Sequence, residues 1–268
     1  MSTPIELRIA GTSIVCEERP GTGQPIVFIH GNSASRKVWA PAFERVGGRH
    51  RLMAFDLPGH GDSGWLPQYS VRAFTDAIVG VAEALGCEDA VFVGHSLGGH
   101  LLLEAAPRLS KASGLVVFGT PPLSRPPHLE AAFLPSPALG FAFTSVLSDA
   151  DIDALGRVLF GSGFTVPDLF RADMRRSDGR MREDLGRALA SGELADEREI
   201  VRTLTRPLAI LHGADEGLVN ASYFEQLEAP TLWRGSVQVV KGAGHYLQVE
   251  RPDAFEQLLG EFVSETRA

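Results

Sequence analysis

The chain has 268 residues, enough for one large α/β domain or for one domain with an insertion. Hydrophobic residues make up 44% and charged residues 22%, an ordinary globular composition that allows a substantial buried core. The formal net charge of −8 argues against a nucleic-acid partner, and no run approaches the ~18 consecutive apolar residues of a membrane span.

The N-terminus and the cysteines predict a cytoplasmic protein. Residues 1–4 carry neither the basic flank nor the apolar core of a secretory signal. Cys16 and Cys87 form no disulfide or metal-binding pattern, as is usual in a reducing compartment. We therefore expect a cytoplasmic protein without a membrane or nucleic-acid partner, and the sequence leaves the oligomeric state open.

The chain begins with predicted strands. The segment 6–17 holds two short apolar stretches around Gly11 and predicts a hairpin. Residues 25–29 form a β-branched run, typical of a buried strand, and 51–55 predict another. A glycine-rich loop follows at 56–64.

Strands and helices then alternate. Apolar residues recur at three- and four-residue steps in 70–85, which predicts a helix capped by Ser70 and ended by Gly86. Residues 90–94 predict a strand, and 97–109 predict a helix. This alternation favours a mostly parallel sheet covered by helices on both faces, the α/β class.

The alternation stops in the middle of the chain. Six prolines fall within 121–137, and no convincing strand appears before 208. We expect a helical cap at 121–205, inserted into an α/β core made of 1–120 and 206–268. Core strands are predicted at 115–118, 208–211 and 237–240, and a last helix begins at Pro252.

A serine lies in the pattern G-x-S-x-G between a predicted strand and a predicted helix. Gly94 and Gly98 flank Ser96, and small residues there allow a sharp turn to approach neighbouring backbone. A serine hydroxyl attacks well only when a base takes its proton. The context predicts that Ser96 is a nucleophile.

The base and the acid should follow the serine in the order acid, then histidine. His245 is the predicted base because it ends the loop 242–245 between the last strand and the last helix. The acid should lie on the turn after the strand 208–211, where Asp215 and Glu216 are both available. Adjacent side chains point in different directions, so we expect only one of them to reach the histidine.

The negative oxygen that forms during acyl transfer needs two backbone donors. The N–H of Leu97, directly after the serine, is one candidate. The loop that follows the strand 25–29 supplies the second, which we assign to the N–H of Asn32, with the Asn32 side chain free to bind substrate. His30 and His60 are interpreted as loop-packing residues, and Asp56 as an acceptor for backbone donors. No metal-binding motif is present, and no cofactor is predicted.

The ordered set of motifs resembles the α/β-hydrolase superfamily over nearly the whole chain. Within it, the sequence resembles the metal-independent N-acylhomoserine lactonases. The residues that carry this resemblance are His30-Gly31-Asn32-Ser33, Gly94-His95-Ser96-Leu97-Gly98-Gly99-His100, Gly119-Thr120-Pro121-Pro122, Asp215-Glu216 and Leu232-Trp233-x-Gly235.

The resemblance implies a serine hydrolase that opens the lactone ring of N-acylhomoserine lactones, bacterial quorum-sensing signals. It also favours Glu216 over Asp215, since the resembled subgroup uses glutamate as its acid. The cap would then bind the acyl chain, and four cap residues are candidate contacts: Phe141, Phe143, Phe160 and Phe164. Two alternatives use the same triad: a general carboxylesterase and a carbon–carbon bond hydrolase. A third alternative is a non-catalytic receptor of the same fold.

Overall fold

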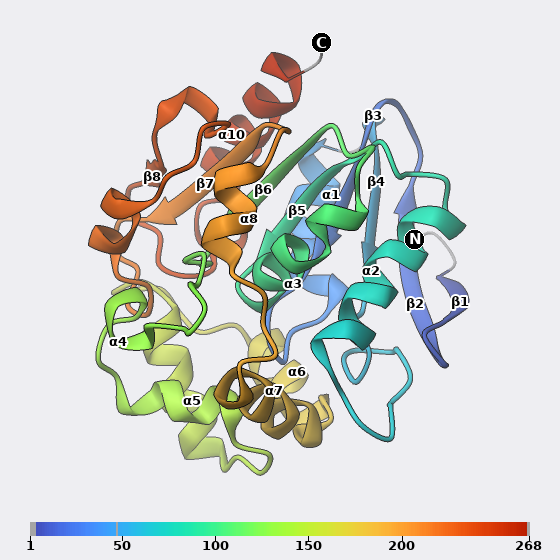
Figure 1. The fold of residues 1–268 in the computed structure, drawn as a ribbon. Coiled ribbons are helices and arrows are strands. Elements are labelled where there is room, and N and C mark those ends of the chain that lie inside the picture. The colour runs from blue at the N-terminus through green and yellow to red at the C-terminus, as the bar shows by residue number, and fades with distance from the viewer. Residues whose placement is uncertain (1–3, 47, 267–268) are drawn as a thin grey trace.

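An eight-stranded sheet forms the centre of the computed structural model, which describes residues 4–46 and 48–266 (Figure 1). The predicted core residues 1–3 and 267–268 lie outside the described residues. The strand order is β1-β2-β4-β3-β5-β6-β7-β8. The strands are β1 (Ile5–Ile9), β2 (Thr12–Arg19), β3 (Gly21–Ile29), β4 (Gly48–Phe55), β5 (Val91–His95), β6 (Gly114–Phe118), β7 (Leu208–Gly213) and β8 (Gln238–Val240). Only the β1–β2 and β2–β4 pairs are antiparallel, which confirms the predicted hairpin and the mostly parallel sheet.

Helices cover both faces of this sheet. α2 (Val71–Ala84), α3 (Leu97–Ala105) and α8 (Glu197–Thr203) cover one face, and α1 (Ala40–Val46) and α10 (Pro252–Glu265) cover the other (Figure 1). Because successive strand side chains point to opposite faces, Phe92 of β5 joins the core under α2 and α3, while Val91 joins the core under α1 and α10. Both faces of the parallel strands are thus apolar, as their β-branched sequences require.

The segment between β6 and β7 contributes no strand to the sheet. Its helices α4 to α7 gather at one end of the sheet in Figure 1, whereas α8 lies over the sheet beside α3. The elements of this group are α4 (Leu129–Ala132), η3 (Pro137–Phe143), α5 (Asp149–Leu159), α6 (Asp168–Arg176) and α7 (Gly179–Ser191). We propose the division into a core and a cap at 121–205 on this basis, with α8 as the part of the cap that packs on the core.

One helical boundary differs from the sequence-based expectation, and two short elements were not expected. The helix predicted over 97–109 ends at Ala105 and continues as the 3₁₀ turn η2 (Ala106–Arg108), because Pro107 has no N–H for the next α-helical hydrogen bond. The elements η1 (Arg36–Trp39) and α1 were not predicted. The helix predicted over 70–85 is confirmed as α2, with the Ser70 hydroxyl accepting from Ala73 N–H at 3.1 Å.

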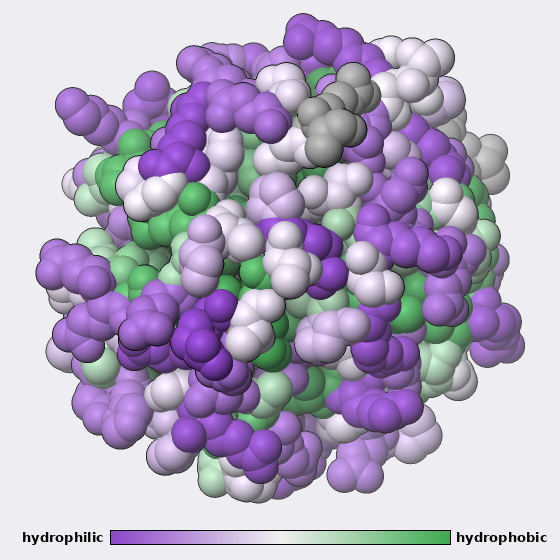
Figure 2. Space-filling view, turned by 45° about the horizontal axis from the view of Figure 1, so that its top comes forward, coloured by the Kyte–Doolittle hydropathy of each residue, from purple (hydrophilic) through white to green (hydrophobic). Residues whose placement is uncertain are grey.

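The face of the molecule shown in Figure 2 is mostly hydrophilic, and its hydrophobic residues appear as small separate areas. Among the described residues, no helix combines the length and apolarity needed to cross a bilayer. The remaining short elements are η4 (Ala221–Gln226), η5 (Trp233–Gly235) and α9 (Leu247–Glu250).

Candidate active site

Ser96 occupies a sharp turn between β5 and α3. Its φ of 52° and ψ of −121° lie in a region that residues with a Cβ rarely adopt. The flanking glycines leave room for this turn: a Cβ on Gly94 would lie 2.6 Å from the Gly98 carbonyl oxygen, and one on Gly98 would lie 2.4 Å from the His30 carbonyl oxygen. The G-x-S-x-G pattern therefore has a steric cause, and the turn holds a half-buried serine at the carboxyl end of β5.

His245 and Glu216 form a buried pair at the same end of the sheet. The Nδ1 atom of His245 lies 2.8 Å from Oε2 of Glu216, and the side chains are 2% and 1% exposed. Burial raises the pKa of Glu216, but the charge and the hydrogen bond of His245 and the N–H of Leu218 outweigh it, so this pKa lies below its ordinary value. An ionised carboxylate at this place holds the proton of the imidazole on Nδ1 and leaves Nε2 to act as a base.

Asp215, the alternative acid, is exposed. Its backbone N–H donates to the Ala243 carbonyl at 2.9 Å. The structure thus brings Glu216, and not Asp215, to the histidine.

Ser96 and His245 line a common cavity of about 50 Å³. No direct hydrogen bond joins the two side chains, a common condition for catalytic pairs without substrate. Gly119 keeps the space for the imidazole, because a Cβ at this position would lie 2.6 Å from Cε1 of His245. The three predicted triad residues therefore meet at one site, although they are far apart in the chain.

The two predicted oxyanion donors lie beside this cavity. Asn32 and Leu97 both line the larger cavity next to Ser96, and neither backbone N–H donates to an acceptor in the described chain. The expectation that the Asn32 side chain is free is wrong, because its Nδ2 donates to the Ala142 carbonyl at 2.9 Å and its Oδ1 accepts from the Ser33 hydroxyl at 2.8 Å. This side chain ties the loop after β3 to η3.

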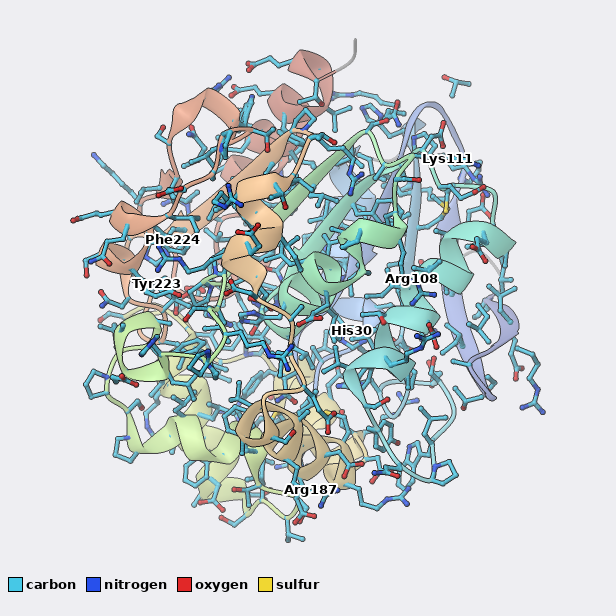
Figure 3. All side chains as sticks on the ribbon, viewed as in Figure 1. His30, Arg108, Lys111, Arg187, Tyr223 and Phe224 are labelled. Atoms are coloured by element: carbon cyan, nitrogen blue, oxygen red, sulfur yellow. The ribbon has the colours of Figure 1, made fainter. Side chains whose placement is uncertain are left out.

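The other loop residues have the structural roles expected of them. His30, labelled near the middle of the view in Figure 3, is fully buried, and its Nε2 accepts from Leu57 N–H at 3.0 Å. Burial lowers the pKa of His30 to about 4 and that of His60 to about 3, so both are neutral. Asp56 accepts hydrogen bonds from the backbone N–H groups of Arg36 and Asp62. None of these residues lines the cavities next to Ser96.

A family model described as the alpha/beta hydrolase family matches residues 26–258. The chain belongs to the alpha/beta hydrolase family. The match spans β3 to α10 and so includes Ser96, Glu216 and His245.

Among solved structures, this hydrolase is similar to a mutant of N-acyl homoserine lactonase AidH complexed with N-hexanoyl homoserine lactone. The TM-score is 0.93, and the two chains are 32% identical over 99% of each. This confirms the resemblance to the metal-independent lactonases. The curated relatives are named for other substrates. The chain is 28% identical to 2-hydroxymuconate semialdehyde hydrolase from Pseudomonas sp. strain CF600, over 92% of this chain and 89% of the relative. It is 33% identical to pimeloyl-[acyl-carrier protein] methyl ester esterase from Methylococcus capsulatus, over 75% of this chain and 80% of the relative.

The loop that carries His245 is held to the cap by one buried carboxylate in this hydrolase. The side chain of Glu250 accepts from three backbone N–H groups: those of Gly244 and Tyr246, which flank His245, at 3.1 Å each, and that of Gly161 in the cap, at 2.8 Å. Glu250 therefore fixes the backbone on both sides of His245, a contact that the sequence patterns did not indicate.

Replacing Glu250 with alanine should lower kcat by about 100-fold with little change in KM, because a misplaced base slows the chemical step more than binding. Glu250→Gln should fall between this variant and the wild type, since one amide oxygen can still accept. Glu44→Ala, an exposed glutamate on α1, is the matched control and should leave both constants unchanged. Steady-state kinetics check this, and a change in KM alone would contradict the positioning role.

The larger cavity next to Ser96 has a volume of about 130 Å³, and the segment 121–205 supplies half of the residues that line it. Of the four phenylalanines predicted to contact substrate, only Phe143 lines it. Phe160 is buried against Tyr246 and stacks at a centroid distance of 4.6 Å, whereas Phe164 is 38% exposed and stacks on Phe160. Phe141 packs on the core under α1 and α10.

Leucines make most of the apolar lining that the segment 121–205 contributes. The cap residues of the cavity wall, besides Phe143, are Leu123, Leu129, Phe133, Leu139, Ala142, Leu185, Leu189 and Leu194. Two polar residues of α3, His100 and Glu104, also face this cavity. Their four-residue spacing after Ser96 was the available signal, because it places all three on one face of the helix.

Within residues 4–46 and 48–266 there is no group of three or more His, Cys, Asp or Glu side chains arranged to hold a metal ion.

Proposed function

We propose that this protein is a serine hydrolase that opens the lactone ring of N-acylhomoserine lactones through an acyl-enzyme. The observation that carries this proposal is the apolar cavity beside Ser96 in a chain with a TM-score of 0.93 to a lactonase complexed with N-hexanoyl homoserine lactone. We propose Ser96 as nucleophile, His245 as base and Glu216 as acid. The buried His245–Glu216 pair supports the last two assignments.

The geometry supports the following reaction. Ser96 Oγ attacks the lactone carbonyl while His245 Nε2 takes its proton, and the N–H groups of Asn32 and Leu97 stabilise the oxyanion. The ring oxygen then leaves as the homoserine hydroxyl and receives the proton from His245. Water, activated by His245, attacks the serine ester and releases the N-acylhomoserine with a free carboxylate.

The apolar cavity beside Ser96 offers a place for the acyl chain of the substrate. Cap residues such as Phe143 and Leu139 present apolar surface within the same cavity as Ser96. Each buried methylene contributes up to about 0.8 kcal/mol, so chain length should affect kcat/KM visibly. The substrate is thus a small acyl compound. We also propose a cytoplasmic location, which the two free cysteines support.

Mass spectrometry of products from a panel of lactones and esters tests this function. Purified protein should convert C6 to C10 N-acylhomoserine lactones to products heavier by one water, with acidification of the medium and no effect of chelators. Intact lactones together with cleaved aryl esters would contradict it and favour a general carboxylesterase.

A carbon–carbon bond hydrolase is the second candidate, because of the likeness to 2-hydroxymuconate semialdehyde hydrolase over most of both chains. The same panel, extended to a ring-cleavage product, separates this activity from lactone hydrolysis.

A further inference from the structure

One wall of the larger cavity differs from the rest. The cap contributes only leucine, phenylalanine and alanine side chains, whereas α3 contributes His100 and Glu104 beside Leu97 and Leu101. At 1.5 Å per residue, His100 lies about 6 Å and Glu104 about 12 Å along the helix axis from Ser96. The cavity therefore runs along α3 from the nucleophile toward polar groups.

His100 is held in one orientation by a buried carboxylate. Its Nδ1 lies 2.9 and 2.8 Å from the two oxygens of Glu197, which is fully buried and also accepts from Leu123 N–H at 2.8 Å. The Nδ1 atom thus donates to Glu197. The Nε2 atom has no hydrogen-bond partner among the described residues, and it is the atom of His100 left for a ligand.

Only one carboxylate oxygen of Glu104 accepts a hydrogen bond from the described chain. Its Oε1 accepts from Ala195 N–H at 2.7 Å, while its Oε2 accepts no hydrogen bond from the described chain. Burial raises the pKa of Glu104 to about 7. A carboxyl group that is partly protonated near neutral pH both donates and accepts, so it can pair with a hydroxyl or a ketone.

We infer that His100 and Glu104 form a subsite for a hydroxyl or ketone group on the acyl chain, several atoms beyond the lactone carbonyl that Ser96 attacks. This inference rests on the proposed function for the position of the acyl chain. A plain alkyl chain in the same place would bury His100 Nε2 and Glu104 Oε2 without giving them hydrogen-bond partners, which is unfavourable. The subsite selects for oxygenated acyl chains in a cavity that is otherwise apolar.

The test compares kcat/KM for N-octanoylhomoserine lactone and for its analogues with one hydroxyl at C5 or C7. Methyl undecanoate and its analogues with one hydroxyl at C8 or C10 form a second series. They place the hydroxyl at the same distance from the attacked carbonyl, because the acyl chain of the lactone begins three atoms beyond the lactone carbonyl. The wild type should prefer at least one hydroxylated compound by about tenfold, the size of effect expected when a buried polar group gains a partner. Glu104→Leu should remove or reverse this preference, whereas Glu104→Gln, which keeps a donor and an acceptor, should retain it.

Glu83→Leu is the matched control, because this exposed glutamate lies on the neighbouring helix α2 and does not line the cavity. It should keep the wild-type preference. Thermal unfolding verifies that the Glu104 variants are folded. Calorimetric binding of both series to Ser96→Ala gives the same comparison without turnover.

The outcomes separate the two proposals. Esters cleaved with a hydroxyl preference while every lactone stays intact would support the subsite and contradict lactonase activity. Lactones opened with no preference for the hydroxylated chains contradict the subsite and leave the lactonase proposal standing. Equal binding of plain and hydroxylated compounds to Ser96→Ala would also overturn the inference.

Discussion

Replacing Ser96 with alanine should lower kcat by about six orders of magnitude, the loss expected when the nucleophile of a serine triad is removed. Alanine keeps a Cβ at the strained turn, so the fold and the melting temperature should change little. Steady-state kinetics on an acyl substrate and thermal unfolding together measure the two effects. Ser264→Ala, a change at an exposed serine on α10, is the control and should keep full activity.

This variant also separates catalysis from a receptor role. Residual activity within about tenfold of the wild type would contradict Ser96 as nucleophile. If the protein instead keeps its full biological output in cells without the serine, the receptor interpretation gains support.

Replacing Glu216 with glutamine should lower kcat by about 10⁴-fold, because an amide cannot hold the imidazole in the productive tautomer or stabilise the imidazolium. The adjacent Asp215→Asn removes the same charge from an exposed side chain and should change kcat by less than about twofold. The pair is closely matched, since the two residues share one turn.

The opposite result, loss of turnover in Asp215→Asn alone, would overturn the assignment of the acid.

The pH dependence of stability gives a second measurement on Glu216. Because the pKa of Glu216 lies below its ordinary value, the carboxylate stays ionised as the pH falls toward that ordinary value. Any stability that it adds is present above the ordinary pKa and is lost only as the pH falls further, through the folded-state pKa.

The sequence predicts the sheet well because each strand carries a local pattern. The β-branched run that ends at Ile29 and the strand before Ser96 are buried on both faces, so they read as continuous apolar segments. The serine turn is equally local, because neighbouring backbone within and beside the turn leaves no room for a Cβ at Gly94 or Gly98.

The acid could not be settled from the residues alone. Asp215 and Glu216 are neighbours of like charge, and only the path of the chain after β7 decides which one is buried against His245. The resemblance to the lactonases favoured Glu216, and the structure brings this residue to the histidine.

The cavity lining was the least predictable part. Hydrophobicity selects residues for burial but does not say which surface they face, so Phe160 and Phe164 were expected at the substrate and stack on each other instead. The same limit hid Glu250, because its contacts join the nearby loop at Gly244 and Tyr246 to Gly161, which is 89 residues away in sequence.

Labelling with an alkyl fluorophosphonate, followed by peptide mass spectrometry, tests the central claim most directly. We expect one adduct per chain, on the peptide that contains Ser96, with activity lost in proportion to labelling and no adduct in the Ser96→Ala variant. An adduct on a different residue, or full turnover by completely labelled protein, would contradict the account.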